Sequence, residues 1–279
     1  MRIRVVHETV YRYERPARGL IQLLRLTPRD HDGQHVRRWS IEPSIEGRLG
    51  AREDGLGNLV HHFASEGPIE ALTLRVAGEV DSHDTGGVVR GTVERAPDAY
   101  YLRDTGLTAA DEGIRAFAHD AGGGAGDPLD RLHRLLAGVH GALAFDTGPT
   151  GVATSAAEAF ALGRGVCQDL AHVFIAAARQ HANPARYVSG YFRRDDGVVD
   201  QEAGHGWAEA LVPGLGWVGF DPANCICSTD AHLRVATGLD YEGAAPIRGS
   251  RQGGGPETLS VRLRVEEPGS SQRQRQTRG

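Results

Sequence analysis

The chain has 279 residues, enough for one large or two ordinary domains, and 40% of them are hydrophobic, which is sufficient to fill a core. It carries 31 basic and 36 acidic side chains, a net charge of −5. This balance leaves no positive field to hold a nucleic acid or an anionic membrane, so we expect neither as a partner.

The N-terminal segment and the cysteine content both bear on the cellular compartment. Charged and apolar residues alternate from Met1 to Tyr13, without the apolar block of a secretory signal, and no later stretch is apolar enough to span a membrane. Three cysteines, an odd number, do not suit a disulfide framework and are better kept in a reducing compartment. We therefore expect a cytoplasmic protein.

The first part of the chain has the period-two pattern of β-strands. Ile3 and Val5 alternate with arginines, and Leu72, Leu74 and Val76 share one parity. Turn signals such as Asp-Gly and Gly-Asn separate the apolar runs, which predicts antiparallel neighbours. Because the chain becomes rich in glycine and proline before residue 100, we expect a β-rich domain over residues 1–100.

Helical spacing replaces this pattern in the next part of the chain. It first appears near Ile114, and three glycines at 122–124 separate this predicted helix from a second one over residues 128–141. Ser155 and Glu158 have the spacing of a capping box, which predicts the start of a third, short helix.

A fourth helix is predicted from Cys167 to about Ala182. Its residues are apolar nearly all round, so it should be central and buried, with Cys167 in its first turn. Strands are predicted after it, which makes the second part α+β. These strands cover residues 186–192, 204–212, 217–221 and 259–265.

Cys167 is the first candidate for chemistry. A cysteine acts as a nucleophile only as a thiolate, and the positive end of a helix macrodipole favours that form. The alternative is a small buried residue with a packing role, which is the commoner fate of a lone cysteine.

The two predicted strands around residue 213 supply its partners. A three-residue hairpin loop at 213–215 would pair Val212 with Gly216 and would put Asp221 diagonal to His205 on one face of the sheet. Diagonal neighbours lie roughly 7–8 Å apart at the backbone, within reach of a histidine–carboxylate hydrogen bond. Taken alone, the histidine could be a half-buried strand residue and the aspartate a turn residue before proline.

Together these residues predict a catalytic triad. Cys167 would be the nucleophile, His205 its base, and Asp221 the group that holds the imidazole in the right tautomer. The backbone N–H of Cys167 would stabilise an oxyanion with a second donor that the sequence does not identify.

Four stretches in the second part carry a resemblance to a known family. They are Gly165-Val166-Cys167-Gln168-Asp169-Leu170-Ala171-His172, Pro184 to Tyr191, Gly204-His205-Gly206-Trp207-Ala208-Glu209, and Gly216 to Pro222. In order and spacing they resemble the core of bacterial transglutaminase-like proteins. The β-rich first part, with Tyr11-Arg12-Tyr13 and Leu56-Gly57-Asn58, is similar to the N-terminal domain that often precedes this core.

The resemblance implies an α+β fold, a papain/transglutaminase-like cysteine hydrolase core preceded by an antiparallel β-sandwich-like domain. The family's triad falls on Cys167, His205 and Asp221. We expect the core over residues 101–268 and a disordered tail over residues 269–279. Two departures, Asn183 in place of glycine and Ala223-Asn224-Cys225 in place of threonine–asparagine–glycine, leave the triad intact.

Members of this family are commonly described as candidate cysteine proteases, and other members of the superfamily cross-link, deamidate or deglycosylate proteins. We therefore expect a cysteine peptidase or amidase that forms a thioester at Cys167, with a protein or peptide as substrate and without a cofactor or metal. The alternatives are a cross-linking or deamidating transglutaminase and a non-catalytic interaction module. A zinc hydrolase using His205, Cys225 and Cys227 is a weaker alternative, because one residue separates these cysteines instead of two to four. The oligomeric state is not predicted.

Other residues near these motifs carry less specific expectations. Asp169 is expected to stabilise the N-terminus of the helix, and His172 is expected to be structural. Arg186 and Tyr187 could line the cleft or occupy an ordinary strand edge.

Overall fold

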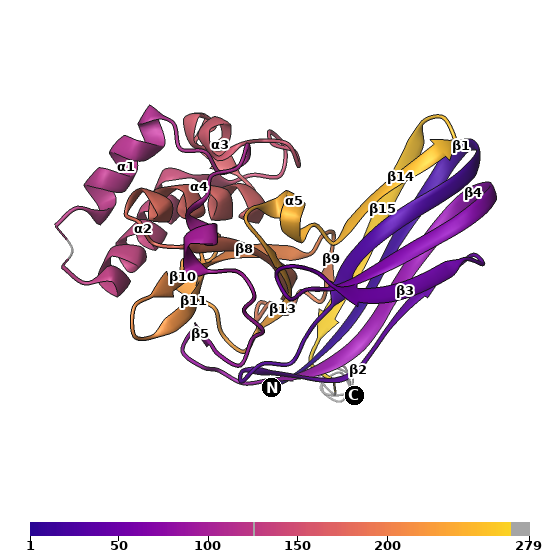
Figure 1. Ribbon diagram of the computed structural model, residues 1–279, viewed down its shortest axis with the longest axis horizontal. Helices are drawn as coiled ribbons and strands as arrows, with labels where there is room; N and C mark the ends of the chain where they lie inside the picture. Colours follow the sequence, from indigo (N-terminus) through magenta and orange to yellow (C-terminus); the bar gives the residue numbers. More distant parts are fainter. Residues whose placement is uncertain (125, 269–279) are drawn as a thin grey trace, which may run out of the picture.

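The computed structural model describes residues 1–124 and 126–268 (Figure 1). The predicted tail, residues 269–279, lies outside the described residues. Within the described ranges, none of the helices has the length and apolar character needed to cross a membrane.

A seven-stranded antiparallel sheet, here called sheet A, forms one side of the molecule (Figure 1). Its order is β2-β4-β1-β15-β9, with β14 paired to β1 and β3 paired to β4. The strands are β1 (Arg2–Thr27), β2 (Gln34–Pro43), β3 (Arg48–Glu53), β4 (Leu59–Ser82), β9 (Asp200–Gln201), β14 (Ile247–Gly253) and β15 (Glu257–Glu266).

Sheet A is folded into two halves by irregularities in its two longest strands. The register of β1 against β4 shifts between Arg12 and Ala17. The first half of β1 pairs with β15 and the second half with β14. Apolar side chains from both halves, including Leu24 and Leu72, belong to one buried cluster. The two halves therefore enclose a common core, as expected of a sandwich-like domain.

A second antiparallel sheet, sheet B, has the order β12-β11-β10-β8-β13, with β5 paired to β11. Its strands are β5 (Val88–Val89), β8 (Ala185–Phe192), β10 (His205–Val212), β11 (Gly216–Asp221), β12 (Ile226–Cys227) and β13 (His232–Gly238). A short parallel pair, β6 (Ala144–Phe145) and β7 (Arg164–Gly165), lies just before the fourth helix.

The four longer helices cover one face of sheet B, and on the other face sheet A packs against strands β8 and β13 (Figure 1). Apolar residues of α1 to α4 share one buried cluster with β8, β10 and β11. On the opposite face, Tyr191 and Leu233 pack against Ile3 and Val5 of sheet A. The helical elements are η1 (Asp98–Leu102), α1 (Glu112–Gly122), α2 (Pro128–Ala142), α3 (Ala156–Leu162), α4 (Cys167–Gln180) and α5 (Tyr241–Ala244).

The predicted elements of the second part are confirmed within a few residues, whereas the sheets cross the expected boundary near residue 100. Strands β14 and β15, from the expected range 101–268, pair with β1 in sheet A. Conversely, β5 pairs with β11 in sheet B. The expected ranges 1–100 and 101–268 are therefore not two separately formed sheets, because an apolar pattern identifies a strand but not the strand with which it pairs.

The capping box before α3 provides a test of local stability. The Ser155 side chain accepts the Glu158 N–H, and the Glu158 carboxylate accepts the Ser155 N–H. Because Ser155→Ala removes one acceptor from the helix N-terminus, we expect it to lower the free energy of unfolding by about 1 kcal/mol. Urea denaturation measures the difference. The exposed Ser260→Ala is the control and should change stability by less than about 0.5 kcal/mol; equal effects would contradict the capping role.

Candidate active site

Cys167 is the first residue of α4, and the start of this helix is held by Asp169. The Asp169 carboxylate accepts the Val166 N–H at 2.8 Å and the Thr150 hydroxyl at 2.7 Å. Gly165 is needed here because a β-carbon at this position would collide with the Asp169 side chain. The predicted role of Asp169 at the helix N-terminus is confirmed. Cys167 itself is a free, partly exposed cysteine.

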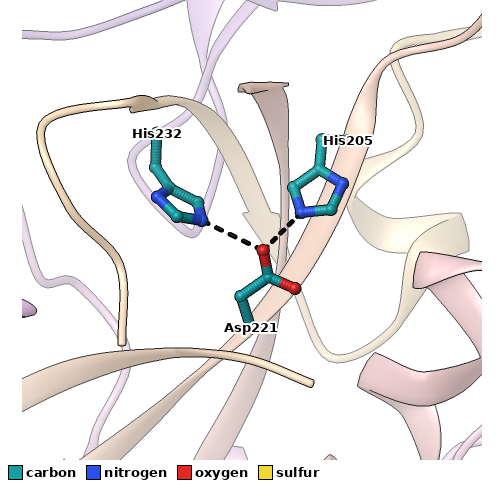
Figure 2. A group of neighbouring side chains, drawn as sticks. All are labelled: His205, Asp221 and His232. Atoms are coloured by element: carbon teal, nitrogen blue, oxygen red, sulfur yellow. Dashed lines mark hydrogen bonds and ion pairs between the residues drawn. The ribbon is translucent and has the colours of Figure 1, made fainter. Parts of the chain in front are cut away.

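His205 and Asp221 meet in the geometry that the hairpin register predicts. Val212 pairs with Gly216 and Ala208 with Phe220, as a three-residue loop requires. The His205 Nε2 atom lies 2.7 Å from the Asp221 Oδ2 atom, and Figure 2 shows the ring directed at the carboxylate. The His205 side chain is 12% exposed and that of Asp221 is fully buried. The carboxylate therefore orients the imidazole from the protein interior.

The remaining nitrogen of His205, Nδ1, is the one available to the thiol. Burial alone would lower the pKa of His205, but the charge and hydrogen bond of Asp221, with smaller contributions from the nearby Cys167, raise it to about 10. Asp221 binds the imidazole and Cys167 lies near it, and both favour its protonated form. The structure thus joins His205 to Asp221 and places Cys167, at the start of α4, near the same ring.

Of the two residues that could line the cleft, Tyr187 lies beside the site and Arg186 does not. Tyr187 is buried beside the site, and burial together with Cys167 raises its pKa well above the usual value. Its hydroxyl occupies the space that a side chain at Gly206 would need, next to His205. Arg186 does not line the cleft, because it is 1% exposed and pairs with Glu209 and Glu94. His172 is structural as predicted, since its ring accepts the Tyr241 N–H.

Five hydrogen bonds converge on the Asp221 carboxylate. Oδ2 accepts from the rings of His205 and His232 and from the Asn224 side chain, and Oδ1 accepts from the backbone N–H groups of Ala223 and Asn224. Burial would raise the pKa of Asp221, but the charge and hydrogen bond of His205 and the contacts with His232 lower it far below the usual range. The carboxylate is therefore ionised despite its burial.

His232 is the member of this cluster that the sequence did not identify. It begins β13, and its Nε2 atom lies 3.1 Å from the Asp221 Oδ2 atom (Figure 2). The Thr229 backbone N–H donates to its Nδ1 atom at 3.0 Å, so Nδ1 carries a lone pair and the ring proton of the neutral form is on Nε2. No motif in the sequence surrounds His232, so no local signal could have assigned this contact.

His205, Asp221 and His232 also have the side-chain types that bind metal ions. Within residues 1–124 and 126–268, His205, Asp221 and His232 are the one group of three such side chains whose ligand atoms lie within 4.8 Å of one another. A metal-bound histidine donates its other ring N–H to an acceptor. At His232 the other nitrogen instead accepts an N–H, which leaves Nε2 protonated and unable to bind a metal. The arrangement fits a hydrogen-bond network and not a metal centre.

The weaker zinc alternative, which used His205, Cys225 and Cys227, is wrong. Cys225 and Cys227 are not in the group of possible ligands found in the described ranges. The Cys227 sulfur lies 3.4 Å from the His133 ring instead. Cys225 has a left-handed backbone, with φ of 55°, and is preceded by Asn224, whose side chain donates to Asp221. Cys225 lies between β11 and β12, and Cys227 is in β12, which pairs with β11.

Comparisons with known proteins agree with this architecture. Residues 3–81 match the family model of the bacterial transglutaminase-like N-terminal region, and residues 115–222 match that of the transglutaminase-like superfamily. An uncharacterized protein of Mycobacterium leprae is 30% identical, over 95% of this chain and 98% of its own length. An uncharacterized protein of Mycobacterium tuberculosis is 28% identical, over 89% of this chain and 87% of its own length.

A solved structure extends the comparison to the fold. A Cytophaga hutchinsonii crystal structure, described as that of "a putative cysteine protease", superimposes with a TM-score of 0.78 at 17% identity, covering 97% of this chain and 91% of that chain. At this level of identity the similarity concerns the fold. From the two matched regions and the near full-length relative, the chain belongs to the bacterial transglutaminase-like family, with its N-terminal region and a transglutaminase-like core.

Proposed function

We propose that the protein is a cysteine-dependent acyl-transfer enzyme that acts on amide bonds through a thioester at Cys167. The observation that carries the proposal is the imidazole of His205, which lies near enough to Cys167 to interact with it electrostatically and is held at 2.7 Å by the buried carboxylate of Asp221. A thiol, a base and an orienting carboxylate in this order are the components of nucleophilic catalysis.

The proposed reaction has two stages. His205 takes the thiol proton, and the Cys167 sulfur attacks the amide carbon to form a tetrahedral oxyanion. The protonated ring then gives its proton to the leaving nitrogen, the C–N bond breaks, and a thioester remains. In the second stage a water molecule, deprotonated by His205, attacks the thioester carbon, and the C–S bond breaks to release a carboxylic acid.

Hydrolysis, and therefore a peptidase or amidase activity, is favoured by the partial exposure of Cys167, because water can reach the thioester. The alternative acceptor is an amine, as in protein cross-linking, or the bond attacked is a side-chain amide, as in deamidation. The chain contains no lysine, so an acceptor lysine would have to come from another protein. A non-catalytic module remains the alternative of another class, and it requires no reactive thiol.

Thiol reactivity tests the proposal without a known substrate. At pH 7, iodoacetamide is expected to alkylate Cys167 at least about tenfold faster than Cys227, because burial raises the pKa of the Cys227 thiol whereas Cys167 is partly exposed beside the His205 imidazole, its proposed base. Peptide mapping by mass spectrometry measures each rate. His205→Ala should reduce the Cys167 rate to an ordinary value while leaving the Cys227 rate unchanged.

Equal rates at the cysteines of the wild-type protein would contradict an activated nucleophile and would favour the non-catalytic module. Incubation with dimethylated casein and dansylcadaverine then distinguishes the reactions. New peptide fragments indicate a peptidase, ammonia release without cleavage or dansyl uptake indicates a deamidase, and dansyl incorporation indicates transfer to an amine. Cys167→Ala is the control for each readout.

A further inference from the structure

The contact between His232 and Asp221 is not explained by the three-residue scheme. Both imidazoles direct Nε2 at the same carboxylate oxygen, His205 at 2.7 Å and His232 at 3.1 Å (Figure 2). The His232 side chain is 2% exposed, so it is not a second base that could reach a substrate. Its position behind the carboxylate suggests an action through Asp221.

The hydrogen bonds of His232 determine which proton it carries. The Thr229 backbone N–H donates to Nδ1, so a neutral ring has its proton on Nε2 and donates it to Asp221. Burial, as the largest cause, lowers the pKa of His232, although Asp221 opposes this. A proton on Nδ1 would face the Thr229 N–H at 3.0 Å and would have only the more distant Thr229 hydroxyl, at 3.4 Å, as an acceptor there. The neutral ring with Nε2–H is therefore the form that fits its surroundings.

The surroundings of His232 hold it in place. The ring packs against Phe192 and Trp207, with ring centroids 4.6 and 5.2 Å away. The titratable groups that face it are Asp221 and His205. A small cavity of about 30 Å³ beside the ring is also lined by the charged or titratable side chains His31, His83, Glu209 and Arg234. Two aromatic rings and the Thr229 N–H thus hold the His232 ring in the orientation that directs Nε2–H at Asp221.

We propose that His232 is a positioning residue that donates a hydrogen bond from Nε2 to Asp221 and thereby fixes the carboxylate oxygen that orients His205. This inference rests on the proposed acyl-transfer function, because it assigns a support to the proposed triad. Without this donor, the Asn224 side chain is the remaining support of Oδ2 opposite the His205 ring, so the carboxylate can shift. A displacement of about 1 Å in a catalytic group can cost about 100-fold in rate.

The test compares two substitutions at His232 with a matched histidine elsewhere. His232→Leu removes the donor and should lower the turnover number for casein cleavage about 10- to 100-fold, with KM unchanged. His232→Gln should restore most of the rate, because its side-chain amide can donate from a similar position. The control is His7→Leu, which removes a buried ring hydrogen-bonded to Tyr191 and Thr9 and should leave turnover unchanged.

The outcomes separate the inference from the proposed function. Fast alkylation of Cys167 in the wild type, together with wild-type turnover in His232→Leu, would overturn the positioning role and leave the proposed function in place. Slow alkylation in the wild type would overturn the proposed function and the inference with it. If casein is cleaved too slowly to measure, the rate of Cys167 alkylation at pH 7 replaces turnover, and the same order of variants is expected.

A measurement on the unmodified protein avoids any effect of misfolded variants. Long-range ¹⁵N–¹H NMR correlations report which nitrogen of each imidazole is protonated. We expect His232 to be neutral at pH 7 with its proton on Nε2. A proton on Nδ1 alone would remove the donor to Asp221 and would contradict the proposal.

Discussion

Replacing Asp221 with asparagine is expected to lower casein cleavage by about 10⁴-fold, the loss seen when the aspartate of a serine-protease triad becomes an amide. Five donors surround the carboxylate, so either orientation of the amide points its NH₂ group at an N–H. His205 then loses the acceptor that keeps a proton on Nε2. An unchanged rate would remove Asp221 from the mechanism.

The pH profile of Asp221→Asn gives a second, independent readout. In the wild type, the pKa of His205 is raised to about 10, so the ring stays protonated up to that pH. Activity that needs the protonated ring as an acid is therefore lost as pH rises through about 10. Loss of the Asp221 charge lowers the pKa of His205, and the alkaline limb should move to lower pH. Asp54→Asn is the control, because Asp54 also accepts several hydrogen bonds but lies in a turn of sheet A.

Replacing Glu209 with leucine is expected to destabilise the protein by about 3–5 kcal/mol, the cost of breaking a buried ion pair by removing one partner. Glu209 is fully buried and binds Arg186 at 2.6 Å and Arg234 at 2.7 Å. Arg186 is also 1% exposed and lies 3.8 Å from the centre of the Trp217 ring. Without Glu209, its charge would keep only the partly exposed Glu94 as a partner. Denaturation by guanidinium chloride measures the difference.

Two comparisons make the Glu209 test specific. Glu94→Gln removes the partly exposed partner and should cost less than Glu209→Leu, because water partly replaces it. Burial raises the pKa of Glu209, but Arg234 and Arg186 lower it further, to about 2. The ionised Glu209 therefore contributes its full stabilisation at pH values above the ordinary carboxyl pKa, and this contribution is lost as pH falls through about 2. The difference between wild type and variant should shrink in that range; a constant difference would indicate a packing effect.

The sequence alone was sufficient to predict those structural features that depend on residues close together along the chain. The capping box of Ser155, the helix that begins at Cys167 and the hairpin from β10 to β11 all follow from local spacing. Because side chains alternate along a strand, one loop length was enough to place His205 and Asp221 on the same face. The triad contact was therefore predictable without a tertiary structure.

Contacts between elements that are not consecutive along the chain were not predictable in this way. His232 and Asp221 belong to β13 and β11, which β10 and β8 separate, and the segment between β12 and β13 has no repeating geometry. The pairing of β14 and β15 with β1 joins opposite ends of the chain. Similarly, Glu94 and Arg186 meet across 92 residues.

The amino-acid pattern thus determined the type and order of most elements, the helix that begins at Cys167 and the register of one hairpin, because these depend on periods of 2 and 3.6 residues and on a short loop. The second histidine on Asp221, the buried ion pairs and the return of the C-terminal strands to sheet A were decided by tertiary structure. Twist and packing bring together residues whose separation along the chain carries no information about their distance in space.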